Sequence, residues 1–320
     1  MRRLGQQAGE SIRCLDTLLT MASSGAAALS IGPAIIVAAV LALIPLTALA
    51  FFHAHTAGWV RRLPLWLRLM CPTALCVPYV LVAMSRGIFR WDWFALYALL
   101  PVAVAGLLWR AAQCDPAQRG DWRDFLVLLT LGLAVDLRWF EPAWPPHYAV
   151  FGKMLLLDAG IYGFLLVRQL DGVGFDLRLR LRDVSTGLRE FLWYTPIAVT
   201  LGLALGFLHM HAVWPRPLTL VGAFLGTFLA IAIPEELFFR GWMQSLLERR
   251  FGRTPALLTT AVLFGLSHFN KRAMHFNWRY VVMAAIAGVF YGRAWRRDRR
   301  VGASVITHAL VDTVWSQWLR

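Results

Sequence analysis

The sequence predicts an all-α polytopic membrane protein, a helical bundle with about eight to ten transmembrane helices. Composition is the first reason: 58% of the 320 residues are hydrophobic and 16% are charged, whereas a soluble domain carries about 25% charged residues. The second reason is that apolar stretches close to the roughly 20 residues needed to cross a bilayer recur along the whole chain. These stretches are continuous and do not alternate, which excludes a transmembrane β-barrel.

The placement of the basic residues supports the same fold class. The formal net charge is +14, but the arginines cluster in short loops between apolar stretches. Such loops are typical of the cytoplasmic face of a membrane protein, whereas a nucleic-acid-binding protein presents a basic stripe along one face. We therefore expect a lipid bilayer as partner and no nucleic acid. The arginine-rich loops within 168–189, 249–253 and 293–300 are predicted to lie on the cytoplasmic side.

The apolar stretches divide into two groups. Residues 1–190 form an N-terminal transmembrane bundle of unassigned role, and residues 191–320 form a C-terminal bundle that contains the motifs described below. In the fifth stretch Lys153 and Asp158 are five residues apart, and we expect them to be mutual partners or to extend their polar ends to the membrane surface. In chain order the stretches are Ala27–Phe52, Leu69–Met84, Phe94–Trp109, Phe125–Leu137, Val150–Val167, Leu192–Leu208, Leu218–Leu247, Pro255–Phe269, Tyr280–Trp295 and Ala303–Trp318.

Two adjacent carboxylates, Glu235 and Glu236, stand out in the seventh stretch. They follow Pro234 at the end of an apolar run, and Arg240 comes one helical turn later. An ionisable residue at the centre of a membrane helix costs about 2.5–3.5 kcal/mol even on the permissive insertion scale. Several such residues at one place therefore indicate a function.

Helical geometry separates the roles of the two carboxylates. Glu236 and Arg240 are four residues apart, which is the spacing of an ion pair, whereas adjacent residues point about 100° apart. Glu235 is therefore left as the unpaired carboxylate and the candidate general base. Pro234 removes one helical hydrogen bond and so predicts a hydrated kink beside Glu235.

Two later helices carry complementary groups. Phe264 and His268 are four residues apart and share a helix face, and the same holds for His308 and Asp312. Polar side chains that converge from several membrane helices usually line a cavity or a pathway. We expect Glu235 and the two histidines to meet, with Asp312, around a small hydrated pocket.

Taken together, these motifs resemble those of the CPBP (ABI) family of intramembrane glutamic proteases, which includes the type II CAAX prenyl endopeptidases and many bacterial relatives. The similarity covers about residues 191–320. In this chain the three motifs read Glu235-Glu236-Leu-Phe-Phe-Arg240, Phe264-Gly-Leu-Ser-His268 and His308-Ala-Leu-Val-Asp312.

The resemblance implies an intramembrane endopeptidase that acts on a membrane-associated protein or peptide. By analogy, Glu235 and His268 hold and activate a water that attacks the scissile carbonyl, and His308 with residue 312 stabilises the oxyanion. Prenyl-processing members carry asparagine where this chain has Asp312, and an ionised aspartate cannot donate a hydrogen bond to an oxyanion. This departure favours a bacterial-type relative, and hence the bacterial inner (cytoplasmic) membrane. The remaining motif residues are expected to support the site: Pro234, Glu236, Arg240 and Phe264.

For an endopeptidase that activates a water with Glu235 and His268, no cofactor is expected. Three other functions remain open. Two histidines with carboxylates could hold zinc with an open position, although the HExxH spacing is absent, so a metal-dependent protease is one alternative. A non-catalytic immunity or scaffold protein of the same fold is another, but interhelical polar contacts average about 0.6 kcal/mol, too little to offset burying so many charges. A proton-coupled transporter is the third, and no matching pair of broken helices supports it.

Overall fold

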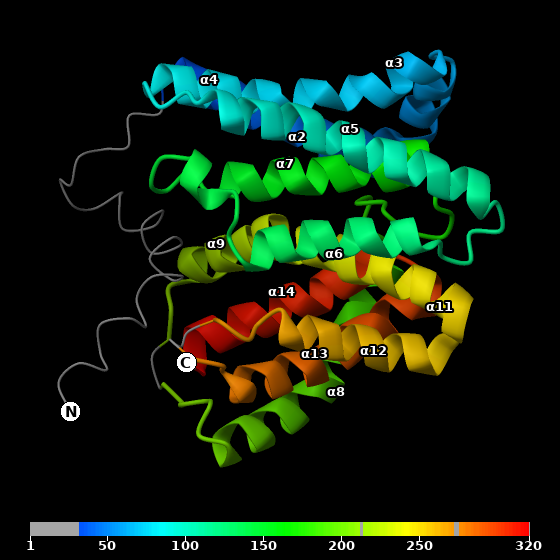
Figure 1. The fold of residues 1–320 in the computed structure, drawn as a ribbon. Coiled ribbons are helices and arrows are strands. Elements are labelled where there is room, and N and C mark those ends of the chain that lie inside the picture. The colour runs from blue at the N-terminus through cyan, green and yellow to red at the C-terminus, as the bar shows by residue number, and fades with distance from the viewer. Residues whose placement is uncertain (1–31, 212–213, 272–274, 320) are drawn as a thin grey trace. The chain divides into compact units, whose positions relative to one another are not determined.

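The computed structural model describes residues 32–211, 214–271 and 275–319, which form helices and connecting loops without a β-strand (Figure 1). The all-α prediction is therefore confirmed. The chain divides into two compact units, Ser30–Arg178 and Leu179–Arg320, which we call the N-terminal unit and the C-terminal unit. The boundary proposed from sequence, after residue 190, falls inside the first helix of the C-terminal unit, α8.

The N-terminal unit is built on helices that pack along one another. α2 packs against α4 and α7, and α5 packs against α6 and α7. The beginning of the first predicted span, Ala27–Phe52, lies outside the described residues. The elements are α2 (Pro33–Arg61), α3 (Leu65–Met70), the 3₁₀ helix η1 (Cys71–Cys76), α4 (Val77–Ser85), α5 (Trp91–Cys114), α6 (Trp122–Asp136), the 3₁₀ turn η2 (Glu141–Ala143), α7 (Val150–Ile161) and the π-helical η3 (Tyr162–Val167).

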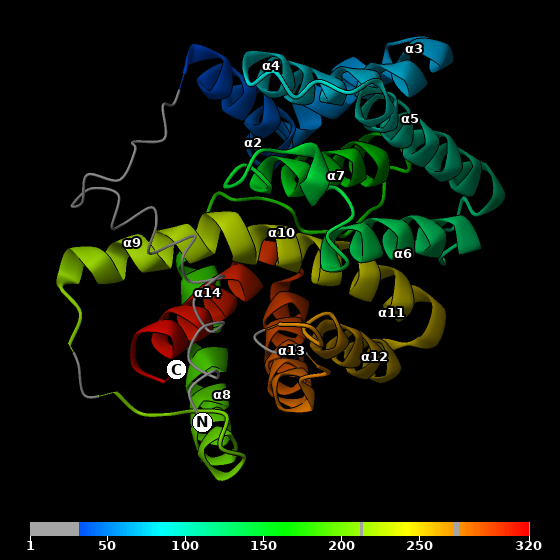
Figure 2. The same ribbon diagram turned by 60° about the vertical axis from the view of Figure 1, so that its left-hand side comes forward.

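In the C-terminal unit, α13 is the central helix and contacts α8, α12 and α14. Figure 2 shows the long helix that runs from α9 to α11 lying across α8, α13 and α14. The elements are α8 (Leu181–Ala204), α9 (Pro217–Thr227), the π-helical η4 (Phe228–Ala232), α10 (Ile233–Glu236), the π-helical η5 (Leu237–Gln244), α11 (Ser245–Phe251), α12 (Arg253–Leu266), α13 (Trp278–Asp298) and α14 (Val301–Trp318).

Five helical segments of the described chain are long and apolar enough to cross a membrane. The other five predicted spans also lie in helices. Of these, α6 and α12 have only 15 and 14 residues, α8 and α13 carry charged residues near their ends, and α14 has 18 residues that include His308 and Asp312. For these helices a crossing stays a prediction, because a span needs about 20 apolar residues. The five segments are Pro33–Arg61, Leu65–Ser85, Trp91–Cys114, Val150–Val167 and Pro217–Phe251.

Large apolar side chains cover much of the outer surface of these helices. In α2, for example, Ile36, Val40 and Ile44 are each about half exposed, at 54%, 56% and 50%. A soluble protein rarely exposes contiguous apolar patches of this kind, whereas lipid chains cover them well. The chain is an integral membrane protein.

The expected link between Lys153 and Asp158 is wrong. Lys153 Nζ instead lies 3.6 Å from Glu141 Oε1, which belongs to the loop before α7. Asp158 is 0% exposed, and neither of its carboxylate oxygens has a hydrogen-bond partner among the described residues. Residues five apart on a helix point to different sides, about 140° apart, so Lys153 faces outward while Asp158 faces the helix packing.

Ion pairs join the arginine-rich segments of the C-terminal unit. Glu248 at the end of the long helix contacts Arg296 at 2.6 Å and Arg299 at 2.7 Å. Arg300 contacts Asp183, near the start of α8, at 2.8 Å. These contacts gather the start of α8, the end of α11 and the turn between α13 and α14 at one end of the unit, as expected for segments that share one side of the membrane.

Two glycines allow α12 and α13 to approach closely. A Cβ atom on Gly265 would lie 2.5 Å from the backbone oxygen of Val281, and one on Gly288 would lie 3.0 Å from Cα of Ala261. Real side chains do not tolerate the first distance, so the glycine at 265 is needed for this packing. The close approach sets the position of Phe264 and of the following turn, which carries His268.

Candidate active site

The carboxylates lie in a helix that is irregular around Pro234. The short α-helical segment Ile233–Glu236 holds Pro234 and both glutamates, and π-helical turns flank it on either side. The helix thus continues through the proline with irregular turns on both sides, and the hydrated kink beside Glu235 stays a prediction. The wider i→i+5 bonding of the π-turns accommodates a residue without an N–H, and such turns often mark functional sites.

Glu236 is the centre of a buried chain of polar contacts. Its Oε1 accepts hydrogen bonds from Arg240 Nη1 at 3.1 Å and from His308 Nδ1 at 2.8 Å. Glu236 and Arg240 are 0% exposed and His308 is 2% exposed. Arg240 Nη2 also donates to the backbone oxygen of Gly288 at 3.1 Å. The pair expected from the i,i+4 spacing is present, and it fastens the long helix to α13 and α14.

His308 links this buried pair to the other two acids. Its Nε2 lies 3.5 Å from Asp312 Oδ2 and 3.9 Å from Glu235 Oε2. The Glu235 side chain is 33% exposed, and its Oε2 has no hydrogen-bond partner. Glu236 therefore holds His308 through one ring nitrogen, while the other nitrogen faces the two carboxylates that remain free to act.

His268 is held by its own backbone. Its Nδ1 lies 2.8 Å from the backbone oxygen of Phe264 and 3.1 Å from the Ser267 hydroxyl. A carbonyl oxygen only accepts hydrogen bonds, so Nδ1 is the donor, and the Nε2 of the neutral ring is left as an acceptor. Among the described residues no direct hydrogen bond joins His268 to Glu235, so the two reach a substrate or a water independently.

The Phe264 ring fills the space between the polar groups. It lies 4.9 Å from the His268 ring and 5.8 Å from the His308 ring, measured between centroids. The Arg240 guanidinium carbon is 4.5 Å from the Phe264 centroid, a cation–π distance. Phe264 is only 2% exposed, so it keeps water from the ion pair and fixes the spacing of the two histidines.

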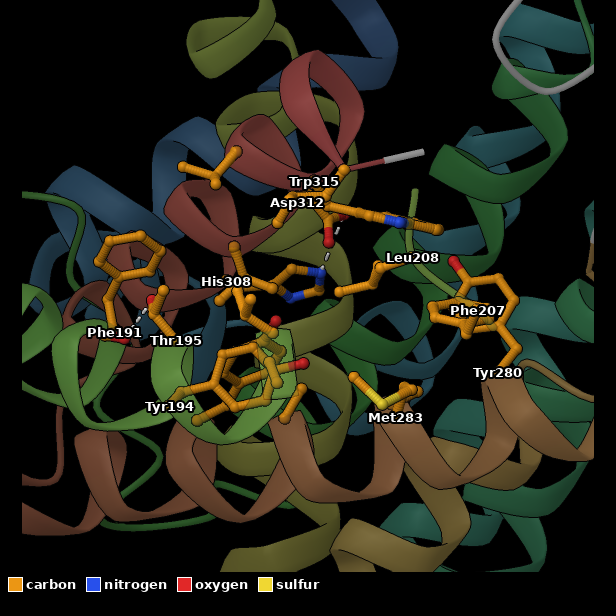
Figure 3. Close-up of a pocket in the computed structure, with 18 of the residues that line it drawn as sticks. Phe191, Tyr194, Thr195, Phe207, Leu208, Tyr280, Met283, His308, Asp312 and Trp315 are labelled. Atoms are coloured by element: carbon orange, nitrogen blue, oxygen red, sulfur yellow. Dashed lines mark hydrogen bonds and ion pairs between the residues drawn. The ribbon is translucent and has the colours of Figure 1, made fainter. Parts of the chain in front are cut away.

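A cavity of about 70 Å³ lies inside the C-terminal unit beside these groups. One water needs roughly 10–15 Å³ of such volume, so several waters or a small side chain can enter. Figure 3 shows Asp312 and His308 joined at its edge, and His268 also lines it. Its other walls are largely apolar and come from α8, α13, α14 and the chain around Leu208.

No metal centre is formed by the side chains that the structure describes, since no three His, Cys, Asp or Glu residues are arranged to hold an ion. Both nitrogens of His308 face carboxylates, and Nδ1 of His268 faces a carbonyl. The donor set therefore does not fit a zinc site of three protein ligands with an open position. The roles proposed below route no step through a metal.

Three tyrosines of the cavity wall were missed from the sequence: Tyr194 of α8 and Tyr280 and Tyr291 of α13. The Tyr291 ring stacks on His308, with centroids 4.7 Å apart and planes 15° apart, and Tyr280 lies 4.9 Å from the His268 ring. A signal was present, because Tyr280, Ala284, Ala287 and Tyr291 recur every three or four residues and all line the cavity.

One of three comparisons with known proteins found a match. Residues 217–314 match the family model described as Type II CAAX prenyl endopeptidase Rce1-like. The matched range runs from the start of α9 into α14 and contains all three motifs. No curated protein and no solved structure matches the chain. The match covers less than a third of the chain, and over residues 217–314 it supports, at the level of the family, a CAAX-protease-type membrane peptidase.

Proposed function

We propose that the C-terminal unit hydrolyses a peptide bond of a membrane-associated protein or peptide by means of an activated water. The observation that carries the proposal is that Glu235 Oε2 and Asp312 Oδ2 lie 3.9 Å and 3.5 Å from the same atom, His308 Nε2. His308, Asp312 and His268 line the cavity, and Glu235 lies next to it through its contact with His308. A cavity of this size admits water below the lipid-facing surface, and the acceptors around it can orient that water.

In the proposed reaction the water oxygen attacks the scissile carbonyl carbon, and its proton passes to the Glu235 carboxylate. The C–N bond of the resulting tetrahedral species then breaks, and the leaving nitrogen takes up the proton that Glu235 received, which restores the carboxylate. His268 Nε2 is placed as a second acceptor for the water, because its Nδ1 is occupied by the Phe264 carbonyl. Glu236 and Arg240 hold His308 in position.

Asp312 receives a positioning role in this proposal. Its Oδ2 lies 3.5 Å from His308 Nε2, so it can accept a hydrogen bond from a protonated Nε2 and keep the ring in the orientation that Glu236 sets. The protein is proposed to work in a bacterial cytoplasmic membrane, with the arginine-rich end of the C-terminal unit on the cytoplasmic side, since loops rich in arginine remain on that side.

The test replaces Glu235 by glutamine in the full chain, reconstituted in lipid vesicles with a mixture of synthetic peptides that carry an apolar anchor. Cleavage, read by mass spectrometry, is expected to fall by about 10²–10⁴-fold, the usual contribution of a general base. The melting temperature should stay unchanged, because the Glu235 side chain is one-third exposed and its Oε2 makes no hydrogen bond.

Glu141→Gln in the N-terminal unit is the matched control, since its side chain has a similar exposure, 31%, and the chemical change is the same. It should cleave like the parent. Cleavage by Glu235→Gln within a few-fold of the parent would contradict the proposal. A chelator added to the parent protein is expected to leave the rate unchanged, and loss of cleavage that zinc restores would replace this mechanism with the metal-dependent one.

A further inference from the structure

Peptide hydrolysis requires hydrogen-bond donors as well as a base. The carbonyl oxygen of the scissile bond becomes negative in the transition state, and removing one donor to it costs about 10²–10³-fold in kcat. The polar groups described so far are mostly acceptors: Glu235 and Asp312 are carboxylates, and Nε2 of neutral His268 carries a lone pair. His308 Nε2 already faces both of those carboxylates.

Two tyrosine hydroxyls in the same cavity are free to donate. Tyr194 and Tyr291 line it from α8 and α13, and they are 6% and 1% exposed. Neither hydroxyl has a hydrogen-bond partner among the described residues. Each hydroxyl oxygen nevertheless keeps some accessible surface, because neither is among the completely buried polar atoms that lack a partner. Both oxygens therefore open onto the cavity. Figure 3 shows the Tyr194 side chain reaching from α8 into the cavity near His308.

Ring packing fixes both hydroxyls before a substrate arrives. Tyr291 stacks on His308 at 4.7 Å, and the Arg240 guanidinium carbon lies 5.3 Å from the Tyr291 centroid. Tyr194 packs against Phe290, with centroids 5.6 Å apart. A donor that is already in place costs no reorganisation when charge develops, and this is the condition for strong electrostatic stabilisation.

Another hydroxyl of the cavity wall is committed elsewhere. Thr195 Oγ1 donates to the backbone oxygen of Phe191 at 2.8 Å, as the dashed line in Figure 3 marks. Tyr280 lies against His268, with ring centroids 4.9 Å apart, whereas Tyr291 stacks on His308.

We infer that the hydroxyls of Tyr194 and Tyr291 donate hydrogen bonds to the carbonyl oxygen of the scissile peptide bond while that oxygen carries negative charge. The protons stay on the tyrosines, and no bond of either side chain is made or broken. This inference rests on the proposed function and adds to it the donor groups that Asp312 cannot supply as a carboxylate. It also places the substrate carbonyl between α8 and α13.

The experiment compares Tyr194→Phe, Tyr291→Phe and the double variant with the parent, in vesicles and with the same anchored peptides. Phenylalanine keeps each ring and removes only the hydroxyl. The double variant should lose about 10²–10³-fold in kcat with KM unchanged within about threefold, and at least one single variant should show a tenfold loss or more. Tyr148→Phe is the matched control, because that hydroxyl accepts from Arg86 in the N-terminal unit; it should retain the parent kcat.

A double variant whose kcat stays within threefold of the parent, or whose loss is in KM alone, overturns the inference. If the double variant fails to fold, as judged by its melting temperature, the two single variants decide by the same criteria. Glu235→Gln is run beside them to separate the two claims. If Glu235→Gln is inactive while both tyrosine variants retain kcat, only the tyrosine inference fails. If Glu235→Gln cleaves like the parent, the proposed function fails and the inference fails with it.

Discussion

Each unit of the protein contains an arginine whose side chain is almost completely buried against a carboxylate, and these two pairs have different surroundings. In the N-terminal unit Arg168 Nε lies 3.0 Å from Asp124 Oδ1, and Arg168 Nη2 lies 2.8 Å from Asp115 Oδ2. In the C-terminal unit Arg240 Nη1 lies 3.1 Å from Glu236 Oε1. In both units the arginine side chain is at most 1% exposed.

The partners of the carboxylate make the difference. Asp124 also accepts from the backbone N–H of Asp121, at the start of α6, so its second contact caps a helix. The second contact of Glu236 is His308, whose other nitrogen faces Glu235 and Asp312 beside the cavity. A buried ion pair in a membrane protein is thus not a site in itself. It becomes part of one when it holds a group that can act on a substrate.

The largest effect is expected for Glu236→Gln, and Asp124→Asn is the matching variant of the N-terminal unit. Glu236→Gln leaves Arg240 without its charged partner, which typically costs about 3–5 kcal/mol of stability. Asp124→Asn should cost less, because Arg168 keeps its contact with Asp115. Only Glu236→Gln also disturbs the ring orientation of His308, and its kcat should fall by up to about 10⁴-fold, as when an amide replaces the carboxylate that orients a catalytic imidazole. Asp124→Asn should keep the parent kcat in the folded fraction. Equal kcat values for the two folded variants would remove the distinction drawn between the pairs.

A smaller effect is expected at the outer carboxylate, Asp312. Its side chain is 29% exposed and stands 3.5 Å from His308 Nε2, so asparagine can still accept a hydrogen bond there. Asp312→Asn should lower kcat by less than about tenfold, whereas Asp312→Ala, which removes the acceptor, should lower it further, toward the lower end of the 10²–10⁴ range for a group acting on proton transfer. Steady-state cleavage of the anchored peptides measures both. Equal losses in the two variants would show that the carboxylate charge matters and that the acceptor alone does not suffice.

The smallest effect is expected at Asp158, the buried carboxylate that has no partner in the described part of the chain. Nothing there compensates a charge, so Asp158→Asn should leave the stability of the N-terminal unit unchanged or raise it by about 1 kcal/mol. Thermal unfolding in detergent measures this, with cleavage expected at the parent rate. A loss of several kcal/mol would mean that the carboxylate has a partner of its own in the membrane.

Sequence reasoning recovered the parts of the site that lie on a single helix. Glu236 and Arg240, like His308 and Asp312, are four residues apart, and helical geometry alone brings such residues together. The contact between Glu236 and His308 joins residues 72 positions apart, and spacing says nothing about how the long helix and α14 pack. The family resemblance placed both residues in the site but assigned Glu236 only a supporting role.

The misses have physical causes of the same kind. Lys153 pairs with Glu141, which lies in the 3₁₀ turn before α7 and therefore outside the period of the helix that carries Lys153. The tyrosines of the cavity were not predicted, because a hydroxyl group adds no periodicity to the sequence of α8 or α13. The π-helical turns on both sides of Pro234 could not be predicted either, because they depend on tertiary packing.

The distance between the His268 and His308 rings depends on a residue that has no side chain. The peptide unit of Gly265 rests directly on the main chain of the neighbouring helix, one residue from the ring that touches both histidines. A methyl group added at residue 265 would lie 2.5 Å from the backbone oxygen of Val281, and a backbone oxygen cannot move aside by a change of rotamer. That contact would move His268 away from His308 while leaving both histidines and the glutamates unchanged. The geometry of the site therefore depends on Gly265, a residue that has no functional group.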